Sequence, residues 1–252
     1  MDKEDRTLRK ILIDFVASLF LVENKVYRSL KALLFAPARL PLCYIKGNTI
    51  RYVRPIQFFL LANLIYYLAP QIDTFNSNYK TQMHGLPYSA WIYPKVLSHL
   101  EEKGLEEVDF QRQFDRTTSQ LAKLIVILLA PMMGFLLWAL HAKKRQFYAG
   151  DHIAVALYIL TFIILVLAVL LPIMLRLAHW LFSGLELTEQ IFSGLVIVVI
   201  TLYVTLAFRG VYQQRPWVAT LKGLCFALFF IPFLHLFRFI LLLATLGILF
   251  NS

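Results

Sequence analysis

The stretch "YIKGNTIRYVRPIQFFLLANLIYYLAP", residues 44–70, places three cations directly before an apolar run. Lys46, Arg51 and Arg54 lie before or at the start of the segment 53–70, which approaches the ~20 apolar residues that a membrane-spanning helix needs. Pro55 suits the first turn of that helix. The stretch therefore predicts a membrane helix that starts from a positively charged side. Its cations could set the topology, hold an anionic ligand, or do both.

The rest of the chain has the composition of a membrane protein. Hydrophobic residues make up 59% of the 252 residues and charged residues 16%, whereas soluble domains average ~45–50% and ~25%. Four more apolar segments follow the first, at residues 121–142, 153–177, 191–211 and 223–250. The last contains Pro232 and is too long for a ~30 Å hydrocarbon core, so it is predicted as one kinked span or two shorter segments. We expect an all-α, polytopic helical membrane protein with about five transmembrane helices.

The N-terminal region, residues 1–52, is predicted to hold amphipathic helices at the membrane interface. Residues 11–22 are apolar but too short to cross. Residues 23–35 follow a helical period, and Pro37 ends that helix. One of its faces is apolar, formed by Val26, Leu30, Leu33 and Leu34, and the other is basic, formed by Lys25, Arg28 and Lys31. A cationic amphipathic helix before a span is typical of the interface.

A polar connector, residues 71–120, separates the first span, 53–70, from a four-helix transmembrane region, 121–252. Its front half, 71–94, has the composition of a loop. Its back half, 95–120, predicts a charged helix or helix pair that runs into the second span.

Lys and Arg alternate between rich and poor connectors. They are frequent in residues 1–54, offset by acids in 71–120, frequent again in "KKR" at 143–145, absent from 178–190, and present at Arg215 and Lys222. By the positive-inside rule, the N-terminus is cytoplasmic and the connector 71–120 is extracytoplasmic. Five spans then place the C-terminus outside. The net charge of +10 fits anionic lipid headgroups better than nucleic acid, for which no binding motif is present.

Ionisable groups at membrane depth are the first candidates for function. Arg238 lies inside the last apolar segment, and His235 and Thr245 fall near the same helical face. They could line a path for an anion or a proton, or Arg238 could instead pair with helix carbonyls or extend towards the interface. Arg209 ends a similar stripe with Thr201 and Thr205, whose hydroxyls more often bond within the bundle.

Asp151 and His152 open the third apolar segment and are secondary candidates. Asp151 is also a good helix cap, and His152 with His141 is only a weak indication of a metal pair. The sequence contains no glycine-rich phosphate loop, nucleophile elbow or HExxH motif. We therefore expect no catalytic residue, metal or cofactor, and an enzyme is the less favoured class.

The opening stretch resembles the core motif of domain-of-unknown-function family 3667, a group of bacterial membrane proteins. The matching positions are Pro37, Tyr44, Ile45, Gly47, Tyr52 and Pro55, and "YAGDHIAVALY" and "AFRGVYQQRPWVATLKG" resemble later elements of the family. Ala38 replaces the usual glycine, "GNT" replaces "GKR", and the cysteine-rich zinc ribbon of many members is missing. The resemblance implies a helical protein of the bacterial inner membrane and no particular activity.

Three functions remain open at this point. The first is a transporter- or channel-like protein for a small anion or lipid-like molecule, using Arg209, His235 and Arg238. The second is a membrane scaffold or assembly factor. The third is a lipid-modifying membrane enzyme with Asp151 and His152. The expected partners are membrane lipids, including anionic headgroups, with a homo-oligomer or a protein partner also possible and no nucleic acid.

Overall fold

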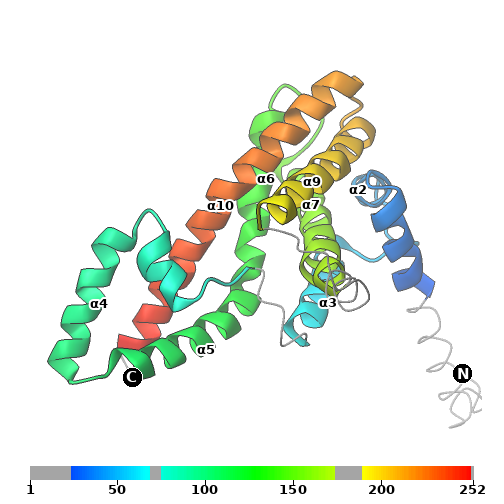
Figure 1. Ribbon diagram of the computed structural model, residues 1–252. Helices are drawn as coiled ribbons and strands as arrows, with labels where there is room; N and C mark the ends of the chain where they lie inside the picture. Colours follow the sequence, from blue (N-terminus) through cyan, green and yellow to red (C-terminus); the bar gives the residue numbers. More distant parts are fainter. Residues whose placement is uncertain (1–23, 69–74, 174–188, 251–252) are drawn as a thin grey trace, which may run out of the picture.

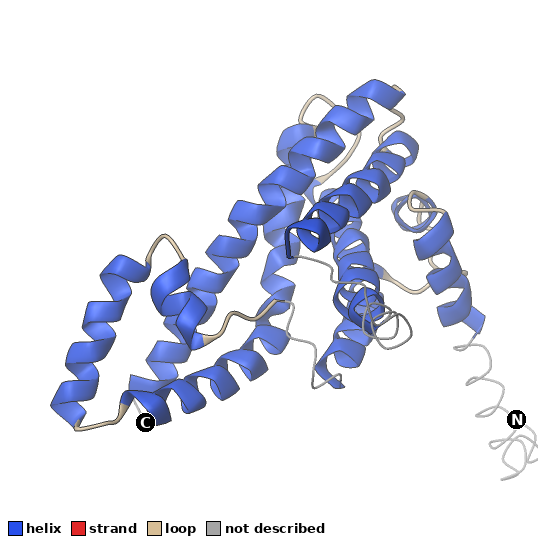
Figure 2. Ribbon diagram, in the orientation of Figure 1, coloured by secondary structure: helices blue, strands red, loops and turns tan. Residues whose placement is uncertain are grey.

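The computed structural model describes residues 24–68, 75–173 and 189–250, and these residues form helices and loops with no strand (Figure 2). Residues 24–35 are the first described helix. The remaining helices are α2 (Arg39–Ile45), α3 (Pro55–Leu68), α4 (Ser89–Lys103), α5 (Glu107–Ile125), α6 (Leu129–Leu140), α7 (Ala149–Phe162), α9 (Glu189–Val211) and α10 (Pro216–Phe250). Short π-helical and 3₁₀ segments lie at Thr81–Gly85, Val126–Leu128 and Ile163–Leu170. The predicted all-α fold is confirmed.

Four helices are long and apolar enough to cross a membrane: Glu107–Leu140, Ala149–Ile173, Gly194–Val211 and Pro216–Phe250. Within the described residues the first expected span is represented by α3, whose 14 residues reach about 21 Å at ~1.5 Å per residue; residues 69 and 70 of that span lie outside the described residues. The described chain thus provides four such helices and one shorter apolar helix, where about five spans were expected.

The last apolar segment is one helix rather than two. α10 continues through Pro232 for 35 residues, a length of about 52 Å. A helix of this length exceeds a ~30 Å hydrocarbon core by several turns. Those extra turns carry the packing of a second unit, described below.

α7 is the centre of the bundle, next to α2, α3 and α6, and it meets α9 where the rings of Phe162 and Tyr203 stack (Figure 1). Almost every residue from Ala154 to Leu165 is buried, as expected for a helix that is apolar on all sides. α6 approaches α7 closely at Gly134, where a Cβ atom would lie 2.9 Å from Cγ1 of Ile153. Only glycine allows this contact without movement of the neighbouring side chain.

A second helical unit surrounds the far end of α10. Phe110, Phe114, Thr118 and Ala122 lie one turn apart on α5 and are buried. Phe110 and Phe114 form one apolar cluster with Tyr79, Met83, Val96, Leu100, Leu242 and Leu246, whereas Ala122 packs in the main core. The backbone N–H of Tyr79 donates to Oδ1 of Asp115 at 2.6 Å, and its hydroxyl donates to Oε1 of Glu107 at 3.0 Å. These bonds join the segment before α4 to α5.

This unit corrects the predicted organisation of the connector. Residues 89–94, expected in a loop, are the first turns of α4, with Pro94 inside the helix. The charged helix expected to run into the second span is present, and it continues from Glu107 to Leu140. The expected boundary between residues 120 and 121 therefore lies inside a continuous helical run.

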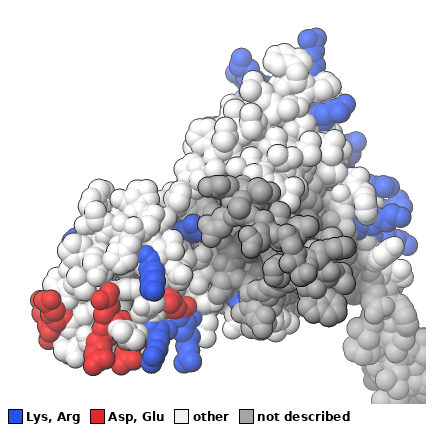
Figure 3. Space-filling model, in the orientation of Figure 1, with Lys and Arg blue, Asp and Glu red and all other residues white. Residues whose placement is uncertain are grey.

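Acidic side chains gather at one end of the molecule. Figure 3 shows them over α4 and α5 at the lower left, mixed with Lys and Arg, whereas the top and right of the view carry Lys and Arg without acidic side chains; we call this part the basic end. At the basic end a Cβ atom on Gly210 would overlap Cβ of Ala38, and the rings of His141 and Tyr212 stack 3.7 Å apart. These contacts bring α2 and the connectors 141–148 and 212–215 to one end of the described structure.

Candidate functional site: a cationic groove beside α2

The helix over residues 24–35 supplies the first wall of the candidate site. It has the predicted amphipathic form: Leu33 is fully buried, whereas Arg28 and Lys31 are exposed. It ends before Pro37, as expected, because proline disfavours the helical conformation in the residue before it. α2 follows after a short turn and begins with Arg39.

Gly47 turns the chain back after α2. Gly47 has φ +76°, its N–H bonds the carbonyl of Tyr44 at 2.9 Å, and Asn48 N–H bonds the carbonyl of Cys43 at 2.9 Å. This pair of bonds is a Schellman motif, which favours glycine because its left-handed residue carries no Cβ penalty. The turn sends residues 48–54 back towards the first helix.

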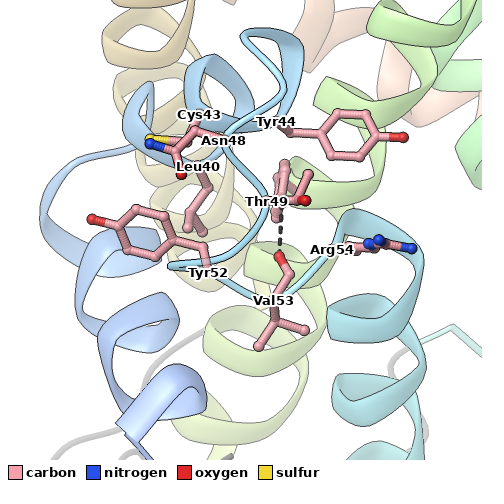
Figure 4. A pocket seen from close by; sticks show the side chains of 9 residues that line it. Leu40, Cys43, Tyr44, Asn48, Thr49, Tyr52, Val53 and Arg54 are labelled. Atoms are coloured by element: carbon pink, nitrogen blue, oxygen red, sulfur yellow. Dashed lines mark hydrogen bonds between the residues drawn. The ribbon is translucent and has the colours of Figure 1, made fainter.

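Two buried hydrogen bonds hold that returning loop at Val53. Its N–H donates to Oγ of Ser29 at 2.9 Å, and its carbonyl accepts from the hydroxyl of Tyr158 on α7 at 2.9 Å. Figure 4 shows this second bond and the close packing around it. Ser29 is fully buried and Tyr158 is 2% exposed. The loop is therefore fixed to both the first helix and the bundle core.

Fixing Val53 also fixes the residues on either side of it. In Figure 4, Tyr52 and Arg54 point to opposite sides of the loop. α3 begins at Pro55, as predicted, so Arg51 and Arg54 precede the helix. Arg51 and Arg54 therefore do not share a helical face, although their spacing of three would place them on one face of a helix, since a loop rather than a helix sets their directions.

The result is a groove of about 270 Å³ between the first helix, the start of α2 and the loop. We call it the cationic groove; its lining residues are Arg28, Lys31, Ala32, Phe35, Ala36, Arg39, Arg51 and Tyr52. The Arg39 and Arg51 guanidinium carbons lie 5.9 and 6.0 Å from the centroid of the Tyr52 ring. Cation–π attraction thus holds both arginines beside one buried ring.

The four cations of the groove have no acidic partner among the described residues. The sequence contains no Asp or Glu from residue 24 to residue 72. Like charges around one small groove repel each other, and an anion placed between them would relieve that repulsion. Arginine is suited to this task because its planar donors can bind a phosphate through two parallel hydrogen bonds.

Of the other predicted cations, Lys46 and Arg54 lie outside the groove. Lys46 is the exposed C-cap of α2. Arg54 borders a crevice with Tyr44 and Asn48 that is too narrow to hold a water molecule. Sequence reasoning had named Arg28 and Lys31 only as a polar helix face and had not singled out Arg39. Nothing in their spacing shows that the loop returns to them.

Arg209, His235 and Arg238 do not gather in one place. Arg209 is exposed in the last turn of α9, next to Phe208, whose ring contacts Phe226 of α10 at 6.0 Å. Arg238 lies 12 residues beyond Phe226, which is about 18 Å along the helix. These residues therefore lie at different levels of the bundle.

Arg238 lies near the second helical unit. The ring of Tyr88 contacts Phe239 at 5.0 Å. Burial raises the pKa of Tyr88 to about 12, and the nearby Arg238 charge opposes that rise. Arg238 Nε and His235 Nδ1 are buried without a hydrogen-bond partner in the described part of the chain. Thr245 bonds Thr118 at 3.1 Å, so that part of the predicted polar stripe joins α10 to α5.

Asp151 and His152 have structural contacts at the basic end. Asp151 caps α7, because its Oδ2 accepts from the N–H of Tyr148 at 2.8 Å. His152 is buried, and its Nδ1 lies 2.8 Å from the hydroxyl of Tyr212. The rings of His141 and His152 are 6.4 Å apart. No group of three or more metal-ligating side chains occurs in the described ranges.

Comparison with known proteins bears on the segment that builds the groove. Residues 23–67 match the family model described as Protein of unknown function (DUF3667). The match confirms the resemblance seen in the sequence and is consistent with a member of that family. It contains all four groove cations together with Ser29, Tyr52 and Val53. The comparisons find no match among curated proteins or solved structures.

Proposed function

We propose that this chain is a multi-pass protein of the bacterial inner membrane that binds the headgroup of an anionic phospholipid in the cationic groove. The observation that carries the proposal is the arrangement of Arg28, Lys31, Arg39 and Arg51 around a 270 Å³ groove, with no acidic partner in the described residues. The orientation in the proposal follows the positive-inside rule. The groove lies at the same end as Lys143–Arg145 and Arg215, and that end faces the cytoplasm.

Apolar side chains near the groove favour a lipid over a free anion. Phe35, which lines the groove, is 80% exposed, and Ile50, next to Arg51, is 89% exposed. Tyr27 on the first helix is 66% exposed. Exposed apolar side chains beside cations are the pattern of a segment that lies in the interface, with the apolar groups among acyl chains and the charges at the phosphates.

This proposal develops the lipid-like half of the transport hypothesis from the sequence. It does not use Arg209, His235 and Arg238 as one small-anion path, because those residues lie at different levels. The lipid-modifying role for Asp151 and His152 receives no support, since one caps α7 and the other is bonded to Tyr212. The predicted role of membrane lipids as partners is kept.

The test replaces two groove cations and compares them with two distant ones. Arg39→Gln with Arg51→Gln removes the pair beside Tyr52, and Lys95→Gln with Lys103→Gln on α4 removes equal charge far from the groove. Binding of phosphatidylglycerol is measured by native mass spectrometry of protein from nanodiscs of increasing phosphatidylglycerol content. At about 1 kcal/mol for each cation near an anionic surface, the groove variant should bind about 30-fold more weakly.

The control variant should bind within about twofold of the unchanged protein. Equal affinity in the groove variant, or an equal loss in the control, would overturn the proposal. Replacing phosphatidylglycerol with phosphatidylcholine, which carries no net charge, should abolish the difference between the two variants.

A further inference from the structure

A second cavity lies at the basic end of the molecule, on different elements from the cationic groove. It has a volume of about 580 Å³ and lies between the end of α6, the connectors after α6 and α9, and the first turns of α10 (Figure 1). We call it the α6–α10 cavity; its lining includes Ala139, Lys143, Lys144, Arg215, Val218 and Lys222. It shares no residue with the groove and has about twice the groove's volume.

The wall on the α6 side holds Lys143 and Lys144 in a short, bonded connector. The N–H of Lys144 donates to the carbonyl of His141 at 2.7 Å, and the N–H of Phe147 donates to the carbonyl of Lys144 at 3.2 Å. His141 is itself buried, and its ring stacks on that of Tyr212 at 3.7 Å. Hydrogen bonds and ring contacts therefore fix the backbone that carries the two lysines.

The opposite wall is one face of α10. Arg215, Val218 and Lys222 all line the cavity, and their spacing of three and four residues places them on the same side of the helix. On another side α10 packs closely against α9, where a Cβ atom on Gly223 would lie 2.6 Å from Oγ1 of Thr205. The first turns of α10 are therefore held in place, and with them the cations of this wall.

The two walls bring four cations together without an acidic partner. These cations are Lys143, Lys144, Arg215 and Lys222, and no Asp or Glu lines the cavity. None of the four forms an ion pair within the described residues. Lys222 is half-buried, and Lys143 and Lys144 lie near enough for their charges to oppose its own. An anion placed between the walls would relieve this repulsion.

Both walls continue into apolar side chains that are exposed. On α10 the face of Lys222 continues with Phe229, seven residues further along, and Phe229 is 51% exposed. On α6, Phe135 lies one turn before Ala139 and is 64% exposed. Both helices belong to segments long and apolar enough to cross a membrane. This arrangement favours a lipid, with its acyl chains along the helices and its headgroup among the cations.

We propose that the α6–α10 cavity binds the headgroup of a membrane lipid that carries two phosphate groups, of the diphosphatidylglycerol class. Basic pockets between membrane helices on the cytoplasmic side are suited to such headgroups. Each wall supplies two cations for one phosphate, with Lys143 and Lys144 on the α6 side. Arg215 and Lys222 on the other side lie seven residues, or about 10 Å, apart along α10. The site is separate from the cationic groove and takes a lipid of higher charge.

The test measures lipid binding by native mass spectrometry of the full chain released from phosphatidylcholine nanodiscs. The nanodiscs contain equal amounts of phosphate as diphosphatidylglycerol or as phosphatidylglycerol, and the two lipids are distinguished by mass. Because a second phosphate engages a second pair of cations, diphosphatidylglycerol should bind at least about tenfold more tightly.

Two double variants each remove one cation from each wall. Lys144→Gln with Lys222→Gln removes the half-buried pair, and Lys143→Gln with Arg215→Gln removes the exposed pair, where the substitutions leave the packing unchanged. Each variant should weaken the binding of diphosphatidylglycerol by about 30-fold. The exposed pair keeps the test decisive if the half-buried pair is also needed for folding.

Lys46→Gln with Arg145→Gln is the matched control, because these cations lie on α2 and on the connector after α6 but line neither the cavity nor the groove. The control should bind diphosphatidylglycerol within about twofold of the unchanged protein. Arg39→Gln with Arg51→Gln in the groove should leave the preference for diphosphatidylglycerol unchanged. Failure of one site is therefore distinguishable from failure of the other.

The proposal fails if the unchanged protein binds the two lipids equally, if both cavity variants bind as the control does, or if the groove variant abolishes the preference. Inorganic pyrophosphate tests a soluble source of the same charge. Displacement of the lipid by an equal concentration of pyrophosphate would assign the cavity to a soluble anion and overturn the proposal. Retention of the lipid supports it.

Discussion

The hydroxyl of Tyr158 should be necessary for the stability of the loop that carries the cationic groove. Tyr158→Phe keeps the buried ring and removes one hydrogen bond, so Val53 loses the 2.9 Å partner of its carbonyl. An orphaned buried acceptor costs about 1–3 kcal/mol, while hydrogen bonds measured inside a membrane protein average about 0.6 kcal/mol. We expect a loss of about 1–2 kcal/mol, which lowers Tm by about 2–8 °C for a chain of this size.

A second substitution tests whether the two bonds at Val53 act together. Ser29→Ala removes the acceptor of the Val53 N–H, and thermal unfolding in detergent is measured for both single variants and the double variant. Because both bonds hold one residue, their losses should deviate from additivity by at least about 0.5 kcal/mol. Tyr27→Phe, at a side chain 66% exposed, is the control. Unchanged stability of Tyr158→Phe, or strictly additive losses, would refute this account of the loop.

Two further predictions concern the basic end. Gly210→Ala should lower the free energy of unfolding, measured by thermal melting, by about 1–3 kcal/mol, because the new Cβ overpacks against Ala38. The control Gly247→Ala has open space around the new Cβ and should have little effect. Equal effects of the two substitutions would contradict the contact between Gly210 and Ala38. Burial holds the pKa of His141 at about 3, below the ~6.5 of the unfolded chain. The contribution of His141 to the free energy of unfolding should therefore be complete above pH ~6.5 and fall as the pH falls towards 3, with a loss of about 2 kcal/mol at pH 5. Thermal melting from pH 7 to 5 should show this loss, and an equal loss in His141→Phe would assign it to other groups.

The membrane class, most of the spans and the amphipathic first helix could be predicted from the sequence, because they depend on local periodicity. Pro37, Gly47 and Pro55 also mark the ends and turns where the structure has them. The start of the helix Ser89–Lys103 was harder to predict, because residues 89–94 have the composition of a loop and the helix is stabilised by packing in one cluster with α5 and α10.

The cationic groove could not be predicted because it depends on contacts distant in sequence. Ser29 meets Val53 across 24 residues, and Tyr158 meets it across 105. A single sequence shows that Arg28, Arg39 and Arg51 are basic, but not that one folded loop brings them to the same ring. The stack of His141 on Tyr212 depends in the same way on how α6 and α9 end.

The most direct test of the proposed lipid site is a cryo-electron microscopy map of the protein in nanodiscs that contain phosphatidylglycerol. The account predicts phosphate density in the cationic groove, within hydrogen-bond reach of Arg39 and Arg51, with acyl chains beside Phe35. A groove filled instead by residues 1–23, whose acids include Asp5 and Asp14, would contradict it. So would a lipid bound only at other surfaces.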